Sequence, residues 1–484
     1  MKNRQYYLDT FKVREQDLET LIGAALSNGG SYSDLYFEYT TFNDIVLRDS
    51  EVTAGGFHVD FGVGIRVLCS EKTGYAYSES TAMSDMLAAA KAAAAIAAAC
   101  PSAPAPVRAA GPCKDLQTGN WYLQKESWRA STNADFLPVL KELEACIRRK
   151  AAAISDPSIK VSKIIAKISS SESDIMMYNS LGELTYDTRP LGSIVASVIF
   201  EKDGATEQKS ASRSFRKGPE MCVEPGLIEE MAAEAVAGIE DRFRARRPKG
   251  GQMPVVMACG ASGILLHEAM GHAFEADFNR KGQSIFTDRI GEKVCMDGIN
   301  IVDDATVAGN RGACNWDDEG VAGQKTYMVR NGVLESYLHD RISAKHFGVA
   351  PTGNGRRESF RYDPIPRMRA TYMESGDCKP SDIIASVSKG IFVNEFSNGQ
   401  VKIGEGDFTF YVKSGYLIEN GRLTMPVKDI NIIGNGPQAL SDITMVGNDL
   451  KIDEGTWTCG KGQSAPVSCG IPTVLVKSLT VGGE

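Results

Sequence analysis

The sequence is poor in histidine and has no long hydrophobic run. Its 484 residues include only five histidines, and the most apolar stretch, residues 86–100, is mostly alanine and is interrupted by Lys91. Because a membrane span needs about 20 apolar residues in a row, this stretch is too short to cross a bilayer. The first 16 residues also lack the apolar core of a signal peptide.

Cysteine density and positive charge are also limited. Eleven cysteines are scattered between Cys69 and Cys469, without the density of a disulfide scaffold. Lys and Arg number 53 against 61 for Asp and Glu, which gives a net charge of −8. This balance argues against a nucleic-acid-binding protein that uses a broad basic surface. We therefore expect a cytoplasmic protein that binds neither membranes nor nucleic acid.

The length predicts roughly two or three domains. The basic segment 244–251, which contains proline and glycine, predicts the main boundary, and the Pro/Ala-rich stretch within residues 101–113 predicts a sub-boundary. We therefore divide the chain into an N-terminal α/β domain, residues 1–247, and a C-terminal β-rich domain, residues 248–484.

Hydrophobic periodicity predicts mixed structure in the first half. Helices are expected at residues 13–26, 135–154 and 225–243, with an alanine-rich helix capped by Ser84. Strand-like runs lie at 32–39, 44–47, 160–168, 174–179 and 193–200, and a hairpin is expected from 62–68 and 74–77.

The second half has few helix signals and two strong hairpin signals. The dipeptides at 331–332 and 420–421 are both Asn-Gly, which favours a tight turn between antiparallel strands. The sequence therefore predicts an α+β fold, in which a mostly antiparallel C-terminal domain carries one metal-binding helix.

That helix lies in residues 254–272, where a short apolar strand leads through a glycine turn into a helical segment. Two of the five histidines, His267 and His272, lie here with Glu268 directly after the first. Paired histidines with a glutamate on one helix are typical of metal-dependent hydrolases.

The spacing of the two histidines requires a distorted helix. Residues five apart are separated by about 140° around an ideal α-helix, so the imidazoles would point in different directions. Both can bind one ion if the helix widens by one residue, as in a π-bulge, or unwinds at Gly271. We therefore predict a distortion at residues 270–271. Glu268 and His272, four residues apart, face the same way in either case.

Two imidazoles do not complete a catalytic zinc site, which normally has three protein ligands and an open position for water. From spacing alone, Glu275 is the conventional third ligand, but spacing does not decide the choice. The other possible third ligands are His58, Asp277, His339, His346 and Cys459.

The chemistry of such a site follows from its residue types. Zinc lowers the pKa of its water and polarises a carbonyl group. Glu268, which is not a ligand, would take the proton of the metal-activated water as general base and pass it to the leaving amine as general acid. The alternative interpretation is a buried, hydrogen-bonded histidine pair with Glu268 as a cap or ion-pair partner.

Several segments share the pattern of one known family. They are residues 62–68 with 74–76, 267–274, 317–320, 351–359, 433–437 with 445–449, and 458–467. In these segments the chain resembles the TldD/PmbA family, also called modulators of DNA gyrase, and within it the metal-binding TldD branch. The segments follow in order along nearly the whole chain, and residues 111–246 are the least diagnostic region.

The resemblance implies a zinc-dependent metallopeptidase that hydrolyses peptide bonds in unfolded or extended peptides. It implies His267, His272 and Cys459 as the metal ligands, so that Cys459 replaces Glu275, and Glu268 as the general base and acid. It also implies an enclosed site in a homodimer or in a hetero-oligomer with a metal-free PmbA (TldE)-like subunit. The alternative is a non-catalytic scaffold or binding subunit of such a complex; the presence of all four residues favours the enzyme.

Three further features have open or structural interpretations. Arg356 and Arg357 suit either a substrate carboxylate or an ion pair at a turn. The acidic residues 317–319 are interpreted as a surface turn, the alternative being a contact that orients a ligand histidine. Cys469 is interpreted as a small buried core residue.

Overall fold

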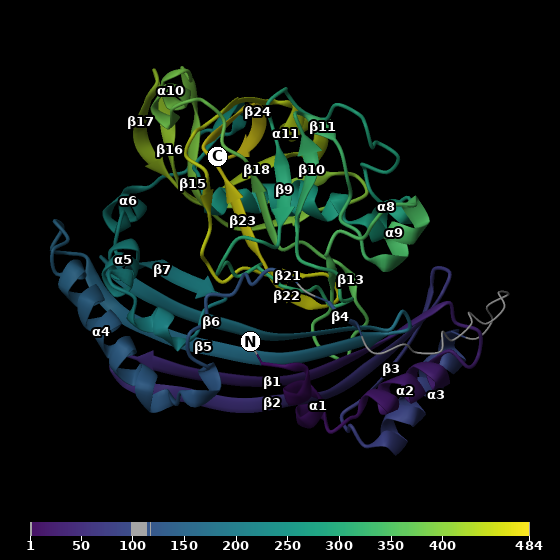
Figure 1. Cartoon of the computed structure of the whole chain (residues 1–484). Coiled ribbons are helices and arrows are strands. Elements are labelled where there is room, and N and C mark those ends of the chain that lie inside the picture. The colour runs from purple at the N-terminus through teal and green to yellow at the C-terminus, as the bar shows by residue number, and fades with distance from the viewer. Residues whose placement is uncertain (1, 98–113, 117, 484) are drawn as a thin grey trace.

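The computed structural model describes residues 2–97, 114–116 and 118–483, so the sub-boundary predicted at 101–113 lies outside the described residues. Helices and long strands form the first half, and mainly short strands form the second, which confirms the predicted α+β class. Figure 1 shows a long curved sheet with helices on its outer face and the second half packed over its other face.

Within the described residues, the first half is built on a seven-stranded, mainly antiparallel sheet. The order is β3-β2-β1-β5-β6, and both β4 and β7 pair with β6. The strands are β1 (Tyr32–Arg48), β2 (Glu51–Cys69), β3 (Lys72–Ser78), β4 (Lys114–Asp115), β5 (Lys160–Asn179), β6 (Glu183–Lys202) and β7 (Ala205–Phe215).

The predicted breaks within two of these strands are wrong. Residues 32–39 and 44–47 belong to one continuous strand, β1, and residues 160–168 and 174–179 belong to β5. Polar residues in the middle of β5, such as Ser171 and Ser173, interrupt its hydrophobic pattern because they line a cavity that faces the second half. The hairpin predicted from 62–68 and 74–77 is confirmed as the β2–β3 pair.

Helices α2, α3 and α4 pack against the outer face of this sheet and bury its apolar side chains. The helices of the first half are α1 (Arg4–Phe11), α2 (Glu15–Ala25), α3 (Met83–Ala97), α4 (Asn133–Ala151), α5 (Leu227–Glu234) and α6 (Ile239–Arg244), with short 3₁₀ turns η1 (Trp128–Ala130) and η2 (Pro219–Val223).

One helix was missed, and two helix predictions need correction. Helix α1 was not predicted, and Ser84 lies inside α3 rather than at its cap, because the helix begins at Met83. The helix predicted at 225–243 is two helices, because Gly238 adopts a left-handed conformation (φ +71°) that interrupts the α-helix.

The second half contains two larger sheets and two small ones in the described part of the chain. One sheet has the order β11-β10-β9-β14-β23-β20, and the other has the order β15-β8-β24-β18-β16-β17, with β19 on β24. Pairing is antiparallel except between β14 and β23 and between β8 and β15. The mostly antiparallel character predicted for this half is thus confirmed.

The elements of the second half are numerous and short. The strands are β8 (Gly251–Met257), β9 (Ile301–Asp304), β10 (Lys325–Arg330), β11 (Val333–Leu334), β12 (Gly355–Arg356), β13 (Ile365–Pro366), β14 (Ala370–Met373), β15 (Lys389–Val401), β16 (Asp407–Glu419), β17 (Arg422–Val427), β18 (Ile430–Asn435), β19 (Ile443–Val446), β20 (Lys451–Ile452), β21 (Thr458–Gly460), β22 (Ser464–Pro466), β23 (Ser468–Ile471) and β24 (Val474–Gly482). The helices outside the segment with the two histidines, residues 261–274, are α8 (Ala276–Arg280), α9 (Arg341–Phe347), α10 (Pro380–Ala385) and α11 (Gly436–Ser441).

Both Asn-Gly hairpins are confirmed. Asn331 and Gly332 (φ +49° and +79°) join β10 to β11, and Asn420 and Gly421 (φ +50° and +75°) join β16 to β17. Two consecutive left-handed residues are the conformation of a type I′ turn, which Asn-Gly favours.

The division of the chain into two domains at residue 247 stays a prediction.

No helix in the described ranges combines the length and the apolar character that crossing a membrane requires.

Helix α4 provides a test of the packing that supports the long sheet. Leu140 is fully buried (0% exposed) in the cluster between α4 and the sheet. Replacing Leu140 with Ala should lower the free energy of unfolding by about 2–5 kcal/mol, because it removes buried methyl groups and leaves a cavity. Denaturant unfolding measures this change. The exposed neighbouring substitution Lys141→Ala should change it by less than about 0.5 kcal/mol, and equal effects of the two would contradict the packing.

Candidate metal centre

The helical segment that carries the two histidines is distorted, as predicted. After β8 the chain passes through η3 (Ala261–Gly263) and one α-helical turn, α7 (Ile264–Leu266), into a π-helical turn, η4 (His267–Gly271), and then into η5 (His272–Phe274). In η4 the backbone N–H of His272 bonds the carbonyl of His267. This wide turn brings residues five apart onto the same face.

Gly271 permits the close packing of this turn. A Cβ at Gly271 would lie 2.1 Å from the sulfur of Met368 and 3.3 Å from the carbonyl oxygen of Leu266. A larger residue would therefore displace Met368 or the turn itself, and with it the relative placement of His267 and His272.

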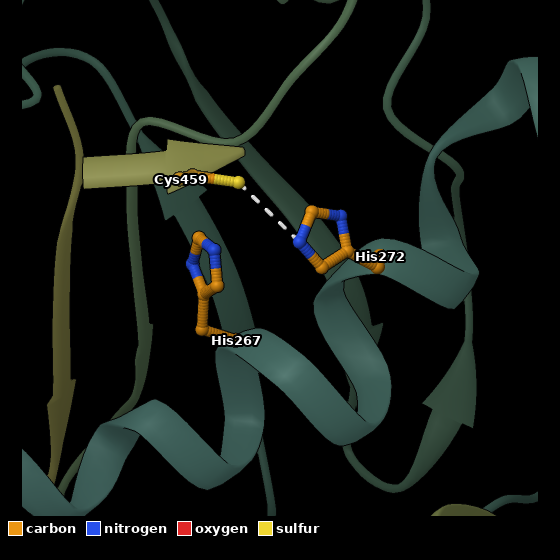
Figure 2. Close-up of side chains that lie close together, drawn as sticks. All are labelled: His267, His272 and Cys459. Atoms are coloured by element: carbon orange, nitrogen blue, oxygen red, sulfur yellow. Dashed lines mark hydrogen bonds between the residues drawn. The ribbon is translucent and has the colours of Figure 1, made fainter. Parts of the chain in front are cut away.

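Cys459 reaches the two histidines from the other end of the second half. It lies on β21, which pairs with β22 in a small hairpin, and Figure 2 shows its sulfur pointing toward both rings. The Sγ atom lies 3.3 Å from Nε2 of His272, and the imidazole centroids of His267 and His272 are 5.1 Å apart. One donor atom from each of the three residues lies within 4.8 Å of the others, and all three side chains are buried.

The cysteine strand is positioned by an arginine. Arg367 is almost fully buried and donates hydrogen bonds to the carbonyl oxygens of Cys459 (2.6 Å) and Gln463 (2.8 Å). Because β21 and β22 form only a two-stranded sheet, these bonds fix the hairpin to the body of the second half.

Glu275 does not join the donor group, and the structure gives it a different role. Its Oε2 lies 2.9 Å from Nδ1 of His272 and 3.0 Å from the ammonium of Lys461. A carboxylate at Nδ1 leaves Nε2 of His272 directed at Cys459, which is the arrangement that orients a metal-binding histidine. This role of Glu275 was not predicted from the sequence, although the three-residue spacing from His272 to Glu275 could have indicated it. Lys461 and Arg367 were also missed.

Burial and neighbouring charges have opposing effects on the pKa values of His272, Cys459 and Glu275. Burial disfavours a charged His272, but Glu275 and Cys459 outweigh it and raise the pKa of His272 to about 10. Burial also disfavours a Cys459 thiolate, but the two histidines outweigh it and lower the pKa of Cys459 to about 5. The pKa of Glu275 falls to about 2, because Lys461 and His272 outweigh its burial. Without a metal, Cys459 is thus a thiolate beside a protonated His272 at neutral pH, and a metal ion bound here would take the place of that proton.

The other residues weighed as third ligands lie elsewhere or have other partners. His58 stacks on Phe42, His346 bonds the carboxylate of Glu71, and Asp277 pairs with Lys461. His339 is buried beside Tyr337 and Phe347. Among the residues that the structure describes, His267, His272 and Cys459 are the one group of three with metal-ligand spacing.

Glu268 lies on the same π-helical turn, directly after His267, and is half-buried. Its carboxylate makes no hydrogen bond or ion pair with another residue of the described chain, unlike that of Glu275. Cys469, interpreted as a core residue, is buried on β23.

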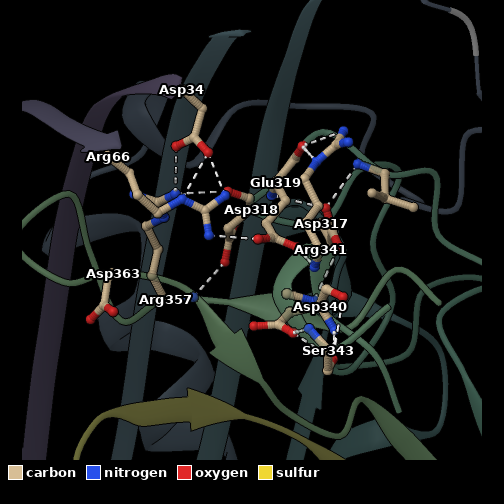
Figure 3. A network of polar contacts seen from close by, with 12 residues as sticks. Asp34, Arg66, Asp317, Asp318, Glu319, Asp340, Arg341, Ser343, Arg357 and Asp363 are labelled. Carbon is tan, nitrogen blue, oxygen red and sulfur yellow. Dashed lines mark hydrogen bonds and ion pairs between the residues drawn. The ribbon is translucent and has the colours of Figure 1, made fainter. Parts of the chain in front are cut away.

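A network of buried ion pairs joins the two halves (Figure 3). Arg66 of β2 pairs with Asp34 of β1 and, at 2.6 Å, with Glu319 of the second half. Arg189 of β6 pairs with Asp318 at 2.5 Å, and Arg357 lies 3.5 Å from Asp34. The pairs Arg66–Glu319 and Arg189–Asp318 therefore each join a cation of the first half to an anion of the second.

The prediction of an acidic surface turn at residues 317–319 is wrong. Asp317, Asp318 and Glu319 are each at most 5% exposed, because buried arginines compensate the charge that normally keeps such a run in solvent. None of them contacts a histidine of the donor group. Arg357 belongs to this network, whereas Arg356 forms no ion pair within the described part of the chain.

Comparison with known proteins identifies the family. The model for the PmbA/TldA metallopeptidase C-terminal domain matches residues 250–483, that for domain 1 matches 33–97, and that for the central domain matches 127–240. A metalloprotease TldD homolog of Buchnera aphidicola (subsp. Acyrthosiphon pisum) is 35% identical over 98% of each chain. One from Haemophilus influenzae is 37% identical over 93% of each chain. The chain belongs to the PmbA/TldD family, and the names of these relatives support a metallopeptidase.

Other comparisons cover less sequence or show the fold alone. A zinc metalloprotease TldD homolog of Saccharolobus solfataricus is 34% identical over 53% of this chain and 57% of its own. A Thermotoga maritima protein described as a modulator of a DNA gyrase superposes with a TM-score of 0.75 at 21% identity, covering 96% of this chain and 99% of its own. TldE from Thermococcus kodakarensis gives 0.71 at 17% identity, covering 96% and 100%.

The ion-pair network predicts a large effect of Arg66. Replacing Arg66 with Met leaves Asp34 and Glu319 buried without their shared cation, so the free energy of unfolding should fall by about 3–5 kcal/mol. Urea unfolding of the full chain measures it. Arg14→Met removes an exposed arginine that pairs only with Asp17 and should have a much smaller effect; a similar loss in both variants would show that the network is not stabilising.

Proposed function

We propose that the chain is a zinc-dependent peptidase that hydrolyses peptide bonds in unfolded or extended peptides. The observation that carries the proposal is the convergence of His267, His272 and Cys459, with one donor atom of each within 4.8 Å of the others. Two nitrogens and a thiolate are a donor set typical of catalytic zinc, which keeps a further position open.

The environment of each donor fits a metal better than a hydrogen-bonded histidine pair. Nδ1 of His267 is buried and has no hydrogen-bond partner in the described chain, a state that is unfavourable unless something else binds the ring. His272 is oriented by Glu275, and the sulfur of Cys459 lies 3.3 Å from its Nε2. His267, His272 and Cys459 would hold the ion.

Bound zinc would supply a Lewis acid for the scissile carbonyl and lower the pKa of the attacking water. Glu268 is the residue proposed to move protons. Its carboxylate has no competing partner in the described chain, so it is available to accept the proton of the attacking water. It would then donate this proton to the leaving amine. Glu275 and Lys461 hold His272 in place and take no part in proton transfer.

The burial of the donor group limits the substrate. His267, His272 and Cys459 are only 1%, 6% and 5% exposed, which restricts access by a bulky folded protein more than by an extended chain. An extended peptide could reach them by lying along a free strand edge, which is a common mode of peptide binding. We propose a cytoplasmic enzyme that acts as a homodimer or in a hetero-oligomer with a PmbA (TldE)-like subunit. The TldE of Thermococcus kodakarensis shares its fold.

The first test of the proposal is the metal content. Protein purified without chelator should contain about one zinc per chain by elemental analysis, and Cys459→Ala should lose most of it. Cys378→Ala, which changes a cysteine outside the donor group, should retain the metal. Metal-free protein, even after zinc is supplied, would contradict the peptidase and favour a scaffold or binding subunit.

The second test concerns Glu268. Glu268→Gln should retain zinc but lower kcat on an unfolded peptide by about 10²–10⁴-fold, because the amide cannot accept the proton of the attacking water. Glu292→Gln, an exposed substitution, should leave kcat unchanged. Full activity of zinc-loaded Glu268→Gln would remove the residue from the mechanism.

A further inference from the structure

The cavity lined by Ser171 and Ser173 of β5 lies between the long sheet and the second half. Its volume is about 180 Å³, and none of the three donor residues lines it. Glu38 and Thr40 of β1 and Ser173 of β5 form part of one wall, and Arg356 and Pro466 form part of the opposite wall.

Arginine is the main charged residue of this cavity. Its lining includes Arg189, Arg216, Arg356, Arg357 and Arg369. Arg189 and Arg357 belong to the ion-pair network, with Asp318 and Asp34 as partners. Arg216, Arg356 and Arg369 are 9%, 5% and 3% exposed, and they form no ion pair with any carboxylate of the described residues.

The three carboxylates of the lining do not compensate these three cations. Asp318 is paired with Arg189, and Glu358 accepts a hydrogen bond from the backbone N–H of Ser464 at 2.6 Å. Glu38 accepts from the hydroxyl of Thr40 and the N–H of Phe360, both at 2.7 Å. Burial raises the pKa of Glu38 to about 7, which reduces its negative charge at neutral pH.

The partners of the three unpaired arginines are neutral. Arg356 donates to the carbonyl oxygens of Met368 (2.5 Å) and Pro466 (2.7 Å), and Arg369 donates from Nε to Gly353 (2.9 Å). Arg216 has one bond of 3.2 Å to Pro190, and its Nε has no partner in the described chain. Arg369 also lies within electrostatic reach of Asp303, Asp317 and Asp318, so Arg216 and Arg356 are the two poorly compensated cations. Burying a cation without a counter-charge is strongly unfavourable, so an anionic ligand would stabilise these two arginines.

The cavity shares structural elements with the metal centre. Pro466 belongs to β22, whose neighbouring residue Ala465 pairs with Cys459. Met368, which also accepts a bond from Arg356, packs against Gly271 between the two histidines. A group bound in the cavity would therefore lie beside the hairpin that carries the cysteine.

We propose that this cavity is an anion subsite that binds a carboxylate of the peptide substrate, the α-carboxylate at its C-terminal end. The identity of the ligand as a peptide rests on the proposed function. Arginine guanidinium groups match a carboxylate with two parallel hydrogen bonds. The volume is below the about 300–1,000 Å³ of sites that enclose whole small molecules, so it suits the end of one chain.

The test compares binding without turnover. Zinc-loaded Glu268→Gln protein is titrated, by fluorescence anisotropy, with one labelled unfolded peptide as the free C-terminal acid and as the C-terminal amide. The acid should bind about 10–100-fold more tightly, which is the range for hydrogen bonds to a charged group. A third peptide, an amide with Asp in place of an internal Asn, reports on side-chain carboxylates.

Substitutions in the cavity test whether the preference for the C-terminal acid over the amide depends on its residues. Adding Arg216→Gln should bring the acid-to-amide ratio close to one, whereas Arg149→Gln, on the exposed face of α4, should leave the ratio unchanged. Glu38→Gln removes the remaining negative charge of Glu38 from the same cavity and should increase the ratio, most clearly above pH 7. It therefore keeps the test decisive if Arg216→Gln does not fold.

The outcomes separate the possibilities. Equal affinity for the acid, the amide and the Asp peptide would overturn the subsite, and so would a preference that Arg216→Gln leaves intact. A preference for the Asp peptide alone, lost in Arg216→Gln, would support the subsite and assign its carboxylate to a side chain. Because the assay measures binding, absence of hydrolysis by the unsubstituted protein would count against the proposed function and not against this result.

Discussion

The width of one helical turn determines the geometry of the metal centre. In an α-helix His267 and His272 would point about 140° apart, and no single ion could contact both. The π-helical turn His267–Gly271 brings the rings to 5.1 Å between centroids. It depends on Gly271, because a side chain there would collide with Met368. The relation between the histidines is therefore set by packing against a distant segment as well as by the helix itself.

The third donor depends on long-range contacts of a different kind. Cys459 lies on a hairpin with only two short strands, which cannot hold its position through sheet hydrogen bonds alone. Buried arginines compensate: Arg367 bonds the carbonyl of Cys459, and Arg311 bonds the carbonyl of Trp457 and the hydroxyl of Thr458. Five donor groups of a planar guanidinium can fix several backbone positions at once, which a lysine cannot do. Hydrogen bonds from these arginines thus hold the hairpin in a position that its two short strands alone would not fix.

The sequence predicted those features that depend on neighbouring residues. The Asn-Gly hairpins and the distortion beside Gly271 follow from local conformational preference, and the α+β class follows from periodicity. Spacing could not select Cys459 over Glu275, because the choice depends on contacts between residues 187 positions apart. The prediction that residues 317–319 form an exposed turn was wrong for a similar reason. An acidic run is expected to be exposed to solvent unless buried cations compensate its charge, and here those cations come from the other half of the chain.

The interface between the two halves contains one region in which buried charges are paired and another in which buried arginines are not. Near Asp34 and Glu319, carboxylates and arginines from different halves are matched, and a matched buried network specifies one arrangement of its elements. Beside the cysteine hairpin, the side chains of Arg216 and Arg356 donate hydrogen bonds only to carbonyl groups, although they are also buried. Unmatched charge of this kind lowers stability, and the matched pairs nearby offset part of this cost. The paired charges around Asp34 and Glu319 thus help the fold to tolerate the cationic cavity, which lies directly beside the hairpin that carries Cys459.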